Sequence, residues 1–297
     1  MRAAAVQTTA TADRADNLRA AGTLVDQAAD AGAELVVLPE YFSVAGSSRS
    51  IKERAETLEG PTVTWAAEQA ERHHIWLVAG TFPERPDPAS PDTRLHSTSC
   101  VLGPDGRVAA VYRKVHLFDV QVEGAKFHES ATFAPGQVLS TVALSPSRTE
   151  GPDTSAGEGG GLPSDPVLGL SVCYDLRFPE LYRILTLQGA TIVTVPSAFT
   201  AATGPAHWEV LLRARAIENE VFVVAAAQIG ELPGGMPSCH GHSMIVDPWG
   251  TVLTDADDGG PGLVIADLDF RDQDRIRRQL PVLANRQPAT YRWPHGN

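Results

Sequence analysis

The sequence contains few cysteines, and they are not arranged in pairs. Cys100, Cys173 and Cys239 are odd in number and far apart, so they do not form the framework of a disulfide-stabilised secreted domain. A reducing compartment suits such a chain. We therefore predict that the protein is cytoplasmic.

Positive charge is also scarce. The chain has 24 lysines and arginines against 36 aspartates and glutamates, a formal net charge of -12, and it contains no basic run. Proteins that bind nucleic acid need concentrated positive charge, because they must neutralise phosphates and release counterions. We therefore expect no nucleic acid partner.

Long hydrophobic runs are absent as well. No stretch approaches the roughly 20 apolar residues that span a bilayer, and the apolar segment after Met1 is too short for a secretory signal. We expect no membrane association. The hydrophobic content of 43% and the charged content of 20% are close to the globular average, which predicts a folded, soluble protein.

Short β-rich apolar runs alternate along the chain with amphipathic, alanine-rich segments. Apolar residues at helical spacing predict helices over residues 16–31 and 180–188. The alternation predicts an α/β fold, since buried strands have continuous apolar runs of this kind. The predicted strands cover residues 3–7, 34–39, 75–80, 167–172, 191–196 and 221–228, and turn residues at 103–106 and 247–250 predict hairpins over 97–111 and 242–254.

A weak internal repeat relates two parts of the chain. Residues 31–39 align with residues 188–196, and in both segments a helix and a glycine turn lead into a strand that ends in proline. Two similar halves predict two packed sheets with helices outside, and we expect residues 1–297 to form a single domain. The alternative is a chance similarity between two buried strands.

The segment 147–166 differs in composition from the rest of the chain. It is rich in glycine, proline and serine and has almost no apolar residues, which predicts a flexible loop inserted within the domain. The loop enters the N-terminal end of the strand that leads to Cys173, whereas Cys173 follows the C-terminal end. We therefore expect the loop to lie away from the chemistry and assign it no catalytic role.

Cys173 occupies the most suggestive position for a nucleophile. An apolar strand ends at this residue and a helix beginning with Pro179 follows, so the thiol is exposed at the edge of a sheet near free backbone N–H groups. Those groups can accept negative charge from a substrate oxygen. Considered alone, the same position also suits a small core residue.

Two charged residues lie among apolar neighbours. Glu40 follows a buried strand, and such surroundings raise the pKa of a carboxyl group and make it a usable general base. Pairing with a structural arginine or capping of the next segment is the alternative for Glu40. Lys114 leaves a hairpin strand, where a solvated edge-strand lysine is the usual explanation.

Taken together, these residues carry a family resemblance. Pro39-Glu40, Arg113-Lys114 and Val172-Cys173-Tyr174-Asp175 occur in this order, and in them the sequence resembles the nitrilase superfamily of carbon–nitrogen hydrolases. The resemblance implies a four-layer αββα sandwich, a homodimer formed through the helical face, and a Glu–Lys–Cys triad that needs no metal or organic cofactor. It covers nearly the whole chain, including residues 3–7, 102–106, 241–243 and 247–250.

Further segments resemble one branch of that superfamily, the omega-amidases and deaminated glutathione amidases. This resemblance implies that the small-molecule substrate is a short ω-amide of a 2-oxo acid. Glu129 matches the second acidic residue of the family, which orients Lys114 or the substrate. The matching segments are 114–120, 127–130, 203–209 and 213–216, whereas the insertion at 147–166 departs from the pattern.

The resemblance also implies the roles of the residues in catalysis. Cys173 is the expected nucleophile, Glu40 the general base, and Lys114 stabilises the oxyanion together with the backbone N–H of Tyr174. The resulting activity is hydrolysis of a linear amide through a thioester, which releases ammonia or an amine and a carboxylic acid.

The candidate substrate-binding residues are predicted from their position in the sequence alone. Arg177 lies four residues past Cys173, and its cation suits a distal carboxylate of the substrate, although a structural pairing with Asp175 or Glu180 is the alternative. Three further residues follow strand ends, where α/β proteins form ligand pockets. They are Tyr41, Phe199 and Thr203.

Other classes of function are weaker hypotheses. The histidines in Cys239-His240-Gly241-His242 and at positions 73 and 74 match no familiar zinc spacing, so we expect no metal. A nitrilase or an N-carbamoyl amino acid amidohydrolase is an alternative of the same fold, because the same triad serves both. A catalytically silent binding or assembly protein is an alternative from another class, and the joint presence of Glu40, Lys114 and Cys173 argues against it.

Overall fold

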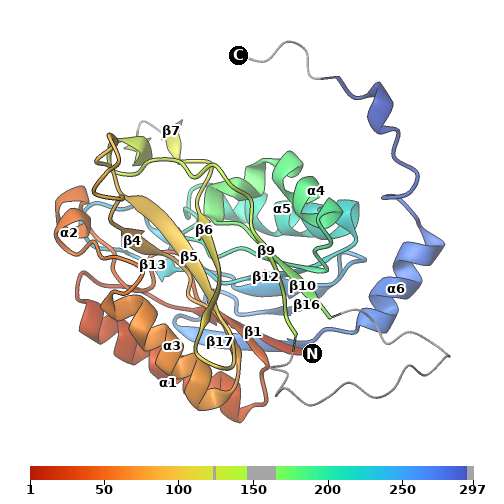
Figure 1. Ribbon diagram of the computed structural model, residues 1–297, viewed down its shortest axis with the longest axis horizontal. Coiled ribbons are helices and arrows are strands. Elements are labelled where there is room, and N and C mark those ends of the chain that lie inside the picture. Colours follow the sequence, from red (N-terminus) through yellow and green to blue (C-terminus); the bar gives the residue numbers. More distant parts are fainter. Residues whose placement is uncertain (123–124, 146–164, 293–297) are drawn as a thin grey trace.

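Two β-sheets form the centre of the molecule. The structure is a computed structural model that describes residues 1–122, 125–145 and 165–292 (Figure 1). The first sheet has the strand order β17-β1-β2-β3-β5-β4, with β6 paired to β5, and its neighbours β1, β2 and β3 are parallel. Its strands are β1 (Arg2–Gln7), β2 (Leu35–Val37), β3 (Trp76–Val78), β4 (Phe82–Glu84), β5 (His96–Leu102), β6 (Val108–Arg113) and β17 (Gly262–Asp267).

The second sheet repeats the central arrangement of the first. Its strand order is β16-β15-β12-β11-β10-β9, and β10, β11 and β12 are parallel neighbours. Two short hairpins lie outside both sheets, β7 (Asp119–Val122) with β8 (Ala125–His128), and β13 (Ile229–Gly230) with β14 (Cys239–His240). The strands of the second sheet are β9 (Thr141–Ala143), β10 (Val167–Leu170), β11 (Ile192–Thr194), β12 (Phe222–Ala225), β15 (Met244–Val246) and β16 (Val252–Asp255).

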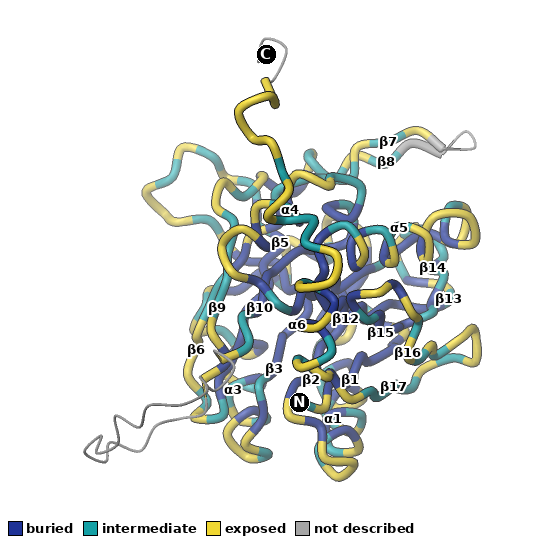
Figure 2. The backbone as a smooth tube through the Cα atoms, turned by 90° about the vertical axis from the view of Figure 1, so that its right-hand side faces the viewer, coloured by how far each residue is buried: buried dark blue, intermediate teal, exposed yellow. Residues whose placement is uncertain are grey.

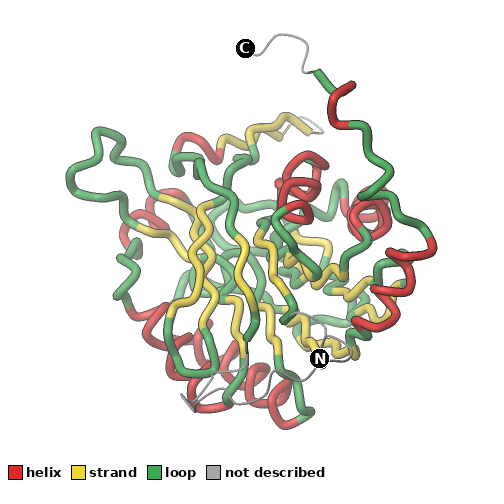
Figure 3. The backbone as a smooth tube through the Cα atoms, turned by 45° about the vertical axis from the view of Figure 1, so that its right-hand side comes forward, coloured by secondary structure: helices red, strands yellow, loops and turns green. Residues whose placement is uncertain are grey.

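Helices cover the outer face of each sheet, as Figures 1 and 3 show. The first sheet contacts α1 (Arg14–Asp30) and α3 (Pro61–His73), and the second contacts α4 (Pro179–Leu187) and α5 (Gly204–Asn219). The layers therefore follow the order αββα, and the predicted fold class is confirmed. The remaining helices are α2 (Ser48–Glu53), α6 (Phe270–Gln279) and the short 3-10 turns η1 (Glu129–Ala131), η2 (Cys173–Arg177) and η3 (Pro288–Thr290).

Strand β1 shows why these residues form a buried sheet. Successive side chains of a strand point to opposite faces, so Ala3 and Ala5 pack into the core shared with the second sheet, whereas Ala4 and Val6 pack beneath the helices. All four are fully buried, as the dark central strands of Figure 2 show. Small alanine side chains let the layers on both faces approach closely.

All six predicted strands and both predicted helices are present, and most of the strands are shorter than predicted. The predicted hairpins are confirmed as β5–β6 and β15–β16. The predicted strand 221–228 ends at Ala225, because the residues beyond it leave the sheet and Gln228 bonds to the backbone of Glu40. The predicted loop at 147–166 lies almost entirely outside the described residues, and the prediction of a single domain over 1–297 stays a prediction.

Among the residues that the structure describes, no helix combines the length and the apolar composition needed to cross a bilayer.

Candidate active site

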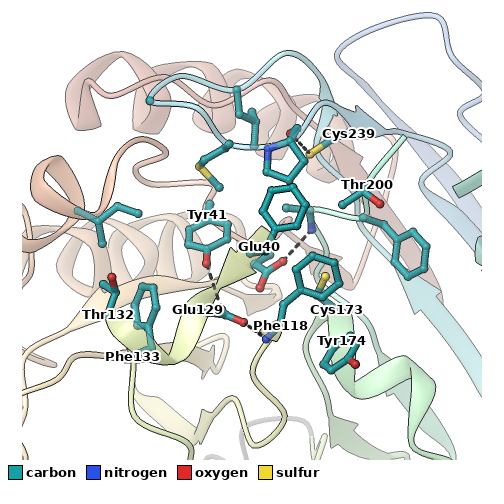
Figure 4. Close-up of a pocket in the computed structure, with 18 of the residues that line it drawn as sticks. Glu40, Tyr41, Phe118, Glu129, Thr132, Phe133, Cys173, Tyr174, Thr200 and Cys239 are labelled. Carbon is teal, nitrogen blue, oxygen red and sulfur yellow. Dashed lines mark hydrogen bonds between the residues drawn. The ribbon is translucent and has the colours of Figure 1, made fainter. Parts of the chain in front are cut away.

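One cavity lies where the C-terminal ends of parallel strands from both sheets meet. Glu40 follows β2, Cys173 follows β10, Ala198 follows β11, and Lys114 directly follows β6. Strand ends of this kind form the ligand crevices of α/β proteins, because the chain turns away and leaves polar groups exposed. The cavity has a volume of about 210 Å³, and Figure 4 shows the side chains around it.

Three buried charges lie together on one wall of the cavity. The Nζ atom of Lys114 is 2.9 Å from Oε1 of Glu40 and 2.8 Å from Oε2 of Glu129. The side chain of Lys114 is only 2% exposed, so the alternative of a solvated edge-strand lysine is wrong. A buried ammonium between two carboxylates is costly to desolvate, and it persists because both carboxylates pair with it.

The protonation of these groups follows from burial and mutual charge. Burial raises the pKa of the Glu40 carboxyl above its usual value, Lys114 opposes this rise and Glu129 adds to it. Burial by itself lowers the pKa of the Lys114 ammonium, but Glu129 and Glu40 outweigh it, and the pKa lies well above the usual value. Lys114 therefore keeps its charge, whereas Glu40 becomes a stronger base than an exposed carboxylate.

Backbone groups from the second half of the chain hold Glu40. Its Oε2 atom accepts a hydrogen bond of 2.8 Å from the N–H of Ala198, and its carbonyl oxygen accepts one of 2.9 Å from Nε2 of Gln228. The next residue, Tyr41, has a φ of 58°, a left-handed conformation that is uncommon for a bulky residue. The turn at Tyr41 brings its hydroxyl 3.1 Å from Oε1 of Glu129.

Glu129 begins the turn after β8 and receives donors from several segments. Besides Lys114 and Tyr41, the backbone N–H of Phe118 donates to its Oε2 atom at 2.6 Å. Figure 4 shows the bonds of the carboxylate with Tyr41 and Phe118, which together fix its position beside the ammonium. Glu129 thus contacts Lys114 directly, and its role in orienting Lys114 or the substrate stays a prediction.

Close backbone packing also fixes Lys114 at the end of its strand. Its N–H donates to the carbonyl of Ser97 at 2.9 Å, and its own carbonyl accepts from the N–H of Gly136 at 2.8 Å. A side chain at Gly136 would place a Cβ 2.0 Å from the carbonyl oxygen of Arg113. Only glycine allows this approach.

The thiol of Cys173 shares the cavity with Glu40 and Lys114. Cys173 has a φ of 48°, and its N–H donates to the carbonyl of Pro196 at 2.9 Å. Burial raises the pKa of the thiol well above its usual value, Glu40 adds to the rise and Lys114 opposes it. The resting sulfur therefore carries its proton, and a nearby base is needed to make it nucleophilic.

The cavity also holds the residues that sequence position alone suggested for substrate binding. Tyr41, Phe199 and Thr203 line it together with Arg177, and so does Tyr174, which was predicted as a backbone donor to the oxyanion. The Nη1 atom of Arg177 donates to Nδ1 of His207 at 3.2 Å, and Nη2 donates to Oγ1 of Thr203 at 3.4 Å. The guanidinium carbon also lies 5.0 Å from the centre of the Phe199 ring.

The alternative pairing of Arg177 with Asp175 or Glu180 is not observed. Within 1–122, 125–145 and 165–292, no carboxylate lies within ion-pair distance of Arg177. Asp175 instead accepts hydrogen bonds from Tyr112, His116 and the backbone. Arg177 thus presents a cation to the cavity that is free to pair with an anion.

The candidate metal residues do not converge. His73 bonds to Asp26 at 2.7 Å, and His242 lies 3.1 Å from Asp255. In the part of the chain that the structure covers, no three histidine, cysteine, aspartate or glutamate side chains form a group that could hold a metal ion.

One wall of the cavity was missed by sequence reasoning. Segments 232–239 and 46–51 also line the cavity and contribute most of its aliphatic and sulfur-containing side chains. The Pro-Gly-Gly-Met-Pro run at 233–237 is typical of a loop, and nothing in it indicates a pocket. The residues of this wall that face the cavity include Ile51, Leu232, Met236 and Cys239, with Phe118 and Phe133 nearby.

Fold and site together define a class of protein. A four-layer αββα sandwich with a thiol, a buried carboxylate and an ammonium in one cavity is the arrangement of a cysteine hydrolase. Residues 2–278 match the model of the family described as carbon-nitrogen hydrolase, and the chain belongs to this family. It is therefore a member of the nitrilase superfamily and a hydrolase of linear carbon–nitrogen bonds, which confirms the predicted resemblance and enzyme class.

Individual relatives are similar over nearly their whole length. A deaminated glutathione amidase from Synechocystis sp. is 41% identical over 96% of this chain and 97% of the relative, and an omega-amidase NIT2 from Danio rerio is 36% identical over 98% and 96%. The crystal structure of Saccharomyces cerevisiae Nit3, a member of branch 10 of the nitrilase superfamily, superposes with a TM-score of 0.80 at 30% identity, and the match covers 97% of this chain and 96% of that one. The chain is a carbon–nitrogen hydrolase of the branch that these amidases represent.

Proposed function

We propose that the protein hydrolyses a short ω-amide of a 2-oxo acid, such as 2-oxoglutaramate or deaminated glutathione, with Cys173 as nucleophile. One observation carries the proposal: Cys173, Glu40 and Lys114 line a single small cavity that also contains Arg177. An amide carbonyl beside the thiol is within the reach of a base and a cation. The names of the similar amidases support the substrate class.

The first half of the reaction forms a thioester. Glu40 takes the proton of the Cys173 thiol, and the sulfur attacks the amide carbonyl. The Lys114 ammonium and the backbone N–H of Tyr174 stabilise the negative charge on the carbonyl oxygen. One such donor lowers the activation barrier by about 2.7–4 kcal/mol. Glu40 then gives its proton to the leaving nitrogen, the C–N bond breaks, and ammonia or an amine departs.

The second half of the reaction returns the enzyme to its starting state. Glu40 takes a proton from water, and the resulting hydroxide attacks the thioester carbonyl. The C–S bond breaks, the acid product leaves, and the Cys173 sulfur regains a proton from Glu40. Glu129 holds Lys114 through both halves, because a charged partner keeps the ammonium in place.

We assign the distal carboxylate of the substrate to Arg177. Its contacts with His207 and Thr203 hold the guanidinium in a fixed orientation, and Phe199 supports it from below. A guanidinium fork binds a carboxylate with two parallel hydrogen bonds, which gives orientation as well as affinity. The apolar wall around Leu232 and Met236 faces the remainder of the substrate.

An activity panel tests the proposed substrate class. Ammonia release is measured from 2-oxoglutaramate, glutamine, an N-carbamoyl amino acid and a simple nitrile. Hydrolysis of deaminated glutathione is followed by the release of its amine product. We expect turnover of 2-oxoglutaramate or deaminated glutathione and little of the others. A preference for the nitrile or the carbamoyl compound overturns the substrate assignment, and absence of all turnover supports a silent binding protein.

Arg177→Gln provides a matched test of the carboxylate assignment. The variant should raise KM for the 2-oxo dicarboxylic amide by about tenfold or more, because a charged hydrogen bond to the substrate is lost. Hydrolysis of a neutral amide of similar size should change little. An equal loss for both substrates contradicts the assignment.

We also propose that the protein acts in the cytoplasm as a homodimer formed through α4 and α5. Exposed apolar side chains gather on these two helices and on the adjacent turn, and such patches are typical of interfaces. Val210→Glu should convert a dimer to a monomer in light scattering, whereas Leu280→Glu on the C-terminal segment should not. The exposed residues are Ile184, Leu187, Val210, Ile217 and Trp249.

A further inference from the structure

Asp175 is a buried carboxylate that the proposed reaction does not use. It lies two residues past Cys173 in the turn η2 and is fully buried, with an exposed fraction of 0%. No lysine or arginine of the described ranges pairs with it. A buried charge without a cationic partner is costly unless several donors bind it.

Four hydrogen bonds surround this carboxylate. Its Oδ2 atom accepts from the hydroxyl of Tyr112 at 2.7 Å and from the backbone N–H of Val172 at 2.9 Å. Its Oδ1 atom accepts from the backbone N–H and the Nδ1 of His116, at 3.0 and 2.7 Å. Nδ1 of His116 is the donor in the last bond, because a carboxylate can only accept.

These donors come from the two segments that carry the reacting groups. Val172 directly precedes Cys173, whereas Tyr112 and His116 lie two residues before and two residues after Lys114. The hydroxyl of Tyr112 also accepts a bond of 3.3 Å from the N–H of Val115. The carboxylate of Asp175 therefore links the turn of the nucleophile to both sides of the lysine.

A second contact joins the same two segments. The ring of His116 stacks on the ring of Phe178, with centroids 3.6 Å apart and planes within 7°. Phe178 ends the turn that contains Cys173, and its N–H donates to the carbonyl of Asp175 at 2.9 Å. His116 thus holds the nucleophile turn by a hydrogen bond and by packing, and these two contributions can be separated.

We propose that Asp175 is a positioning residue that sets the placement of the Cys173 thiol relative to the Lys114 ammonium, acting through His116 and Tyr112. The proposal rests on the proposed function of Cys173 and Lys114. Lys114 is also held at its Nζ atom by Glu40 and Glu129, but those bonds do not reach the turn of Cys173. The hydrogen bonds to Asp175 tie residues on both sides of the lysine to that turn, and aromatic contacts of His116 with Phe178 and of Phe118 with Tyr174 add to the link on one side.

The positive φ of Cys173 explains why such a tie is needed. A non-glycine residue at a φ of 48° is strained by about 1 kcal/mol or more, so the turn relaxes unless its surroundings hold it. Misplacement of a reacting group by about 1 Å reduces an enzymatic rate by about a hundredfold. Loss of the Asp175 contacts should therefore lower kcat more than it changes KM.

Two substitutions of His116 separate the hydrogen bond from the stacking. His116→Asn retains an N–H at the position of Nδ1 and loses the ring, whereas His116→Phe retains the ring and loses the donor. We expect the Phe variant to lose about tenfold or more in kcat with KM within about twofold, and the Asn variant to retain most of kcat. A Phe variant as active as the unmodified enzyme, or an Asn variant that is the weaker of the two, overturns the proposal.

Tyr112→Phe and Tyr182→Phe form a second matched pair. Each removes one fully buried hydroxyl, but the hydroxyl of Tyr112 bonds to Asp175 and that of Tyr182 bonds to Ser171. We expect kcat to fall only for the Tyr112 variant, with similar losses of thermal stability in both. Equal effects on kcat indicate a merely structural role and contradict the proposal.

Alkylation of Cys173 gives a readout that needs no substrate. The rate of reaction with iodoacetamide is followed against pH by mass spectrometry, which distinguishes Cys173 from Cys100 and Cys239. We expect the His116→Phe and Tyr112→Phe variants to shift this pH profile, and the His116→Asn and Tyr182→Phe variants to match the unmodified enzyme. Unchanged profiles overturn the positioning role, whereas failure of the amidase panel with shifted profiles overturns only the proposed substrate.

Discussion

The strands β2 and β11 occupy equivalent places in the two halves of the chain, yet the residues that follow them differ in chemistry. Each strand lies between two parallel neighbours and follows a helix, α1 or α4. Each then continues to a proline, Pro39 or Pro196. The next residue is Glu40 in the first half and Ser197 in the second.

The two strand ends divide the work of the site. Glu40 presents a carboxylate that pairs with Lys114, whereas Ser197 presents a buried, neutral hydroxyl that lies beside the Cys173 thiol. The second half contributes backbone instead: the carbonyl of Pro196 accepts from Cys173, and the N–H of Ala198 donates to Glu40. The same backbone arrangement thus presents a proposed general base after β2 and backbone hydrogen-bonding groups after β11.

The largest effect is expected when the nucleophile of the second half is removed. Cys173→Ala should abolish turnover, because no other group forms the thioester. Circular dichroism and thermal melting should show a folded protein. Cys100→Ala is the matched control, since Cys100 is a fully buried cysteine of β5 outside the cavity, and its activity should stay within about twofold of the unmodified enzyme.

A pair of substitutions tests whether the two strand ends have different roles. Glu40→Gln should lower kcat by about 10²- to 10⁴-fold, the usual contribution of a general base. Ser197→Ala changes the equivalent residue of the second half and should lower kcat by no more than about tenfold, because it removes a neutral contact of the Cys173 thiol and no charge. Similar losses in both variants, measured by ammonia release, refute the division of roles.

The pH dependence sharpens the assignment of the base. Glu40 must be ionised to act, so activity rises with pH through its pKa. Burial raises that pKa and the charge of Glu129 adds to the rise, while Lys114 opposes it. Glu129→Gln removes a negative charge that raises the pKa of Glu40 and leaves Lys114 free to pair with Glu40. The pKa of Glu40 should therefore fall, and the acidic limb of the kcat/KM profile should move to lower pH.

Tyr41→Phe is the control for this pH shift. It removes a hydrogen bond to Glu129 but keeps the charge of that carboxylate, so the acidic limb should stay in place. A limb that moves upward in the Glu129→Gln variant shows that the titrating group is not Glu40.

The smallest effect on activity is expected inside the two equivalent strands. Val36 in β2 and Val193 in β11 are both fully buried and correspond in the aligned segments. Val36→Ala and Val193→Ala should each cost about 1–3 kcal/mol in free energy of unfolding, since two methyl groups and their contacts are lost. Urea unfolding should give similar values, and kcat should change by less than about twofold if the strands are equivalent.

Local sequence was sufficient to locate most elements near the site. Strands β2 and β10, which lead to Glu40 and Cys173, have clear apolar runs because they are buried on both faces. Strand β6, which leads to Lys114, is partly exposed, and turn residues at 103–106 marked its hairpin instead. Helices α2, α3, α5 and α6 were not predicted. In α6 only Ile276 is an apolar buried residue, so no run of apolar residues marks the helix, and its position depends on contacts such as those of Gln273 with Thr191 and Glu220.

The sequence by itself determined the family, the α/β alternation and the three residues proposed to act in catalysis, since each depends on residue type and local order. Tertiary structure alone decided which charged groups lie together. Lys114 lies between Glu40 and Glu129, and Arg177 lines the cavity instead of pairing with Asp175. Hydrogen bonds between side chains distant in sequence depend on distances of a few tenths of an ångström. Only the packing of two sheets sets those distances, and no local pattern encodes them.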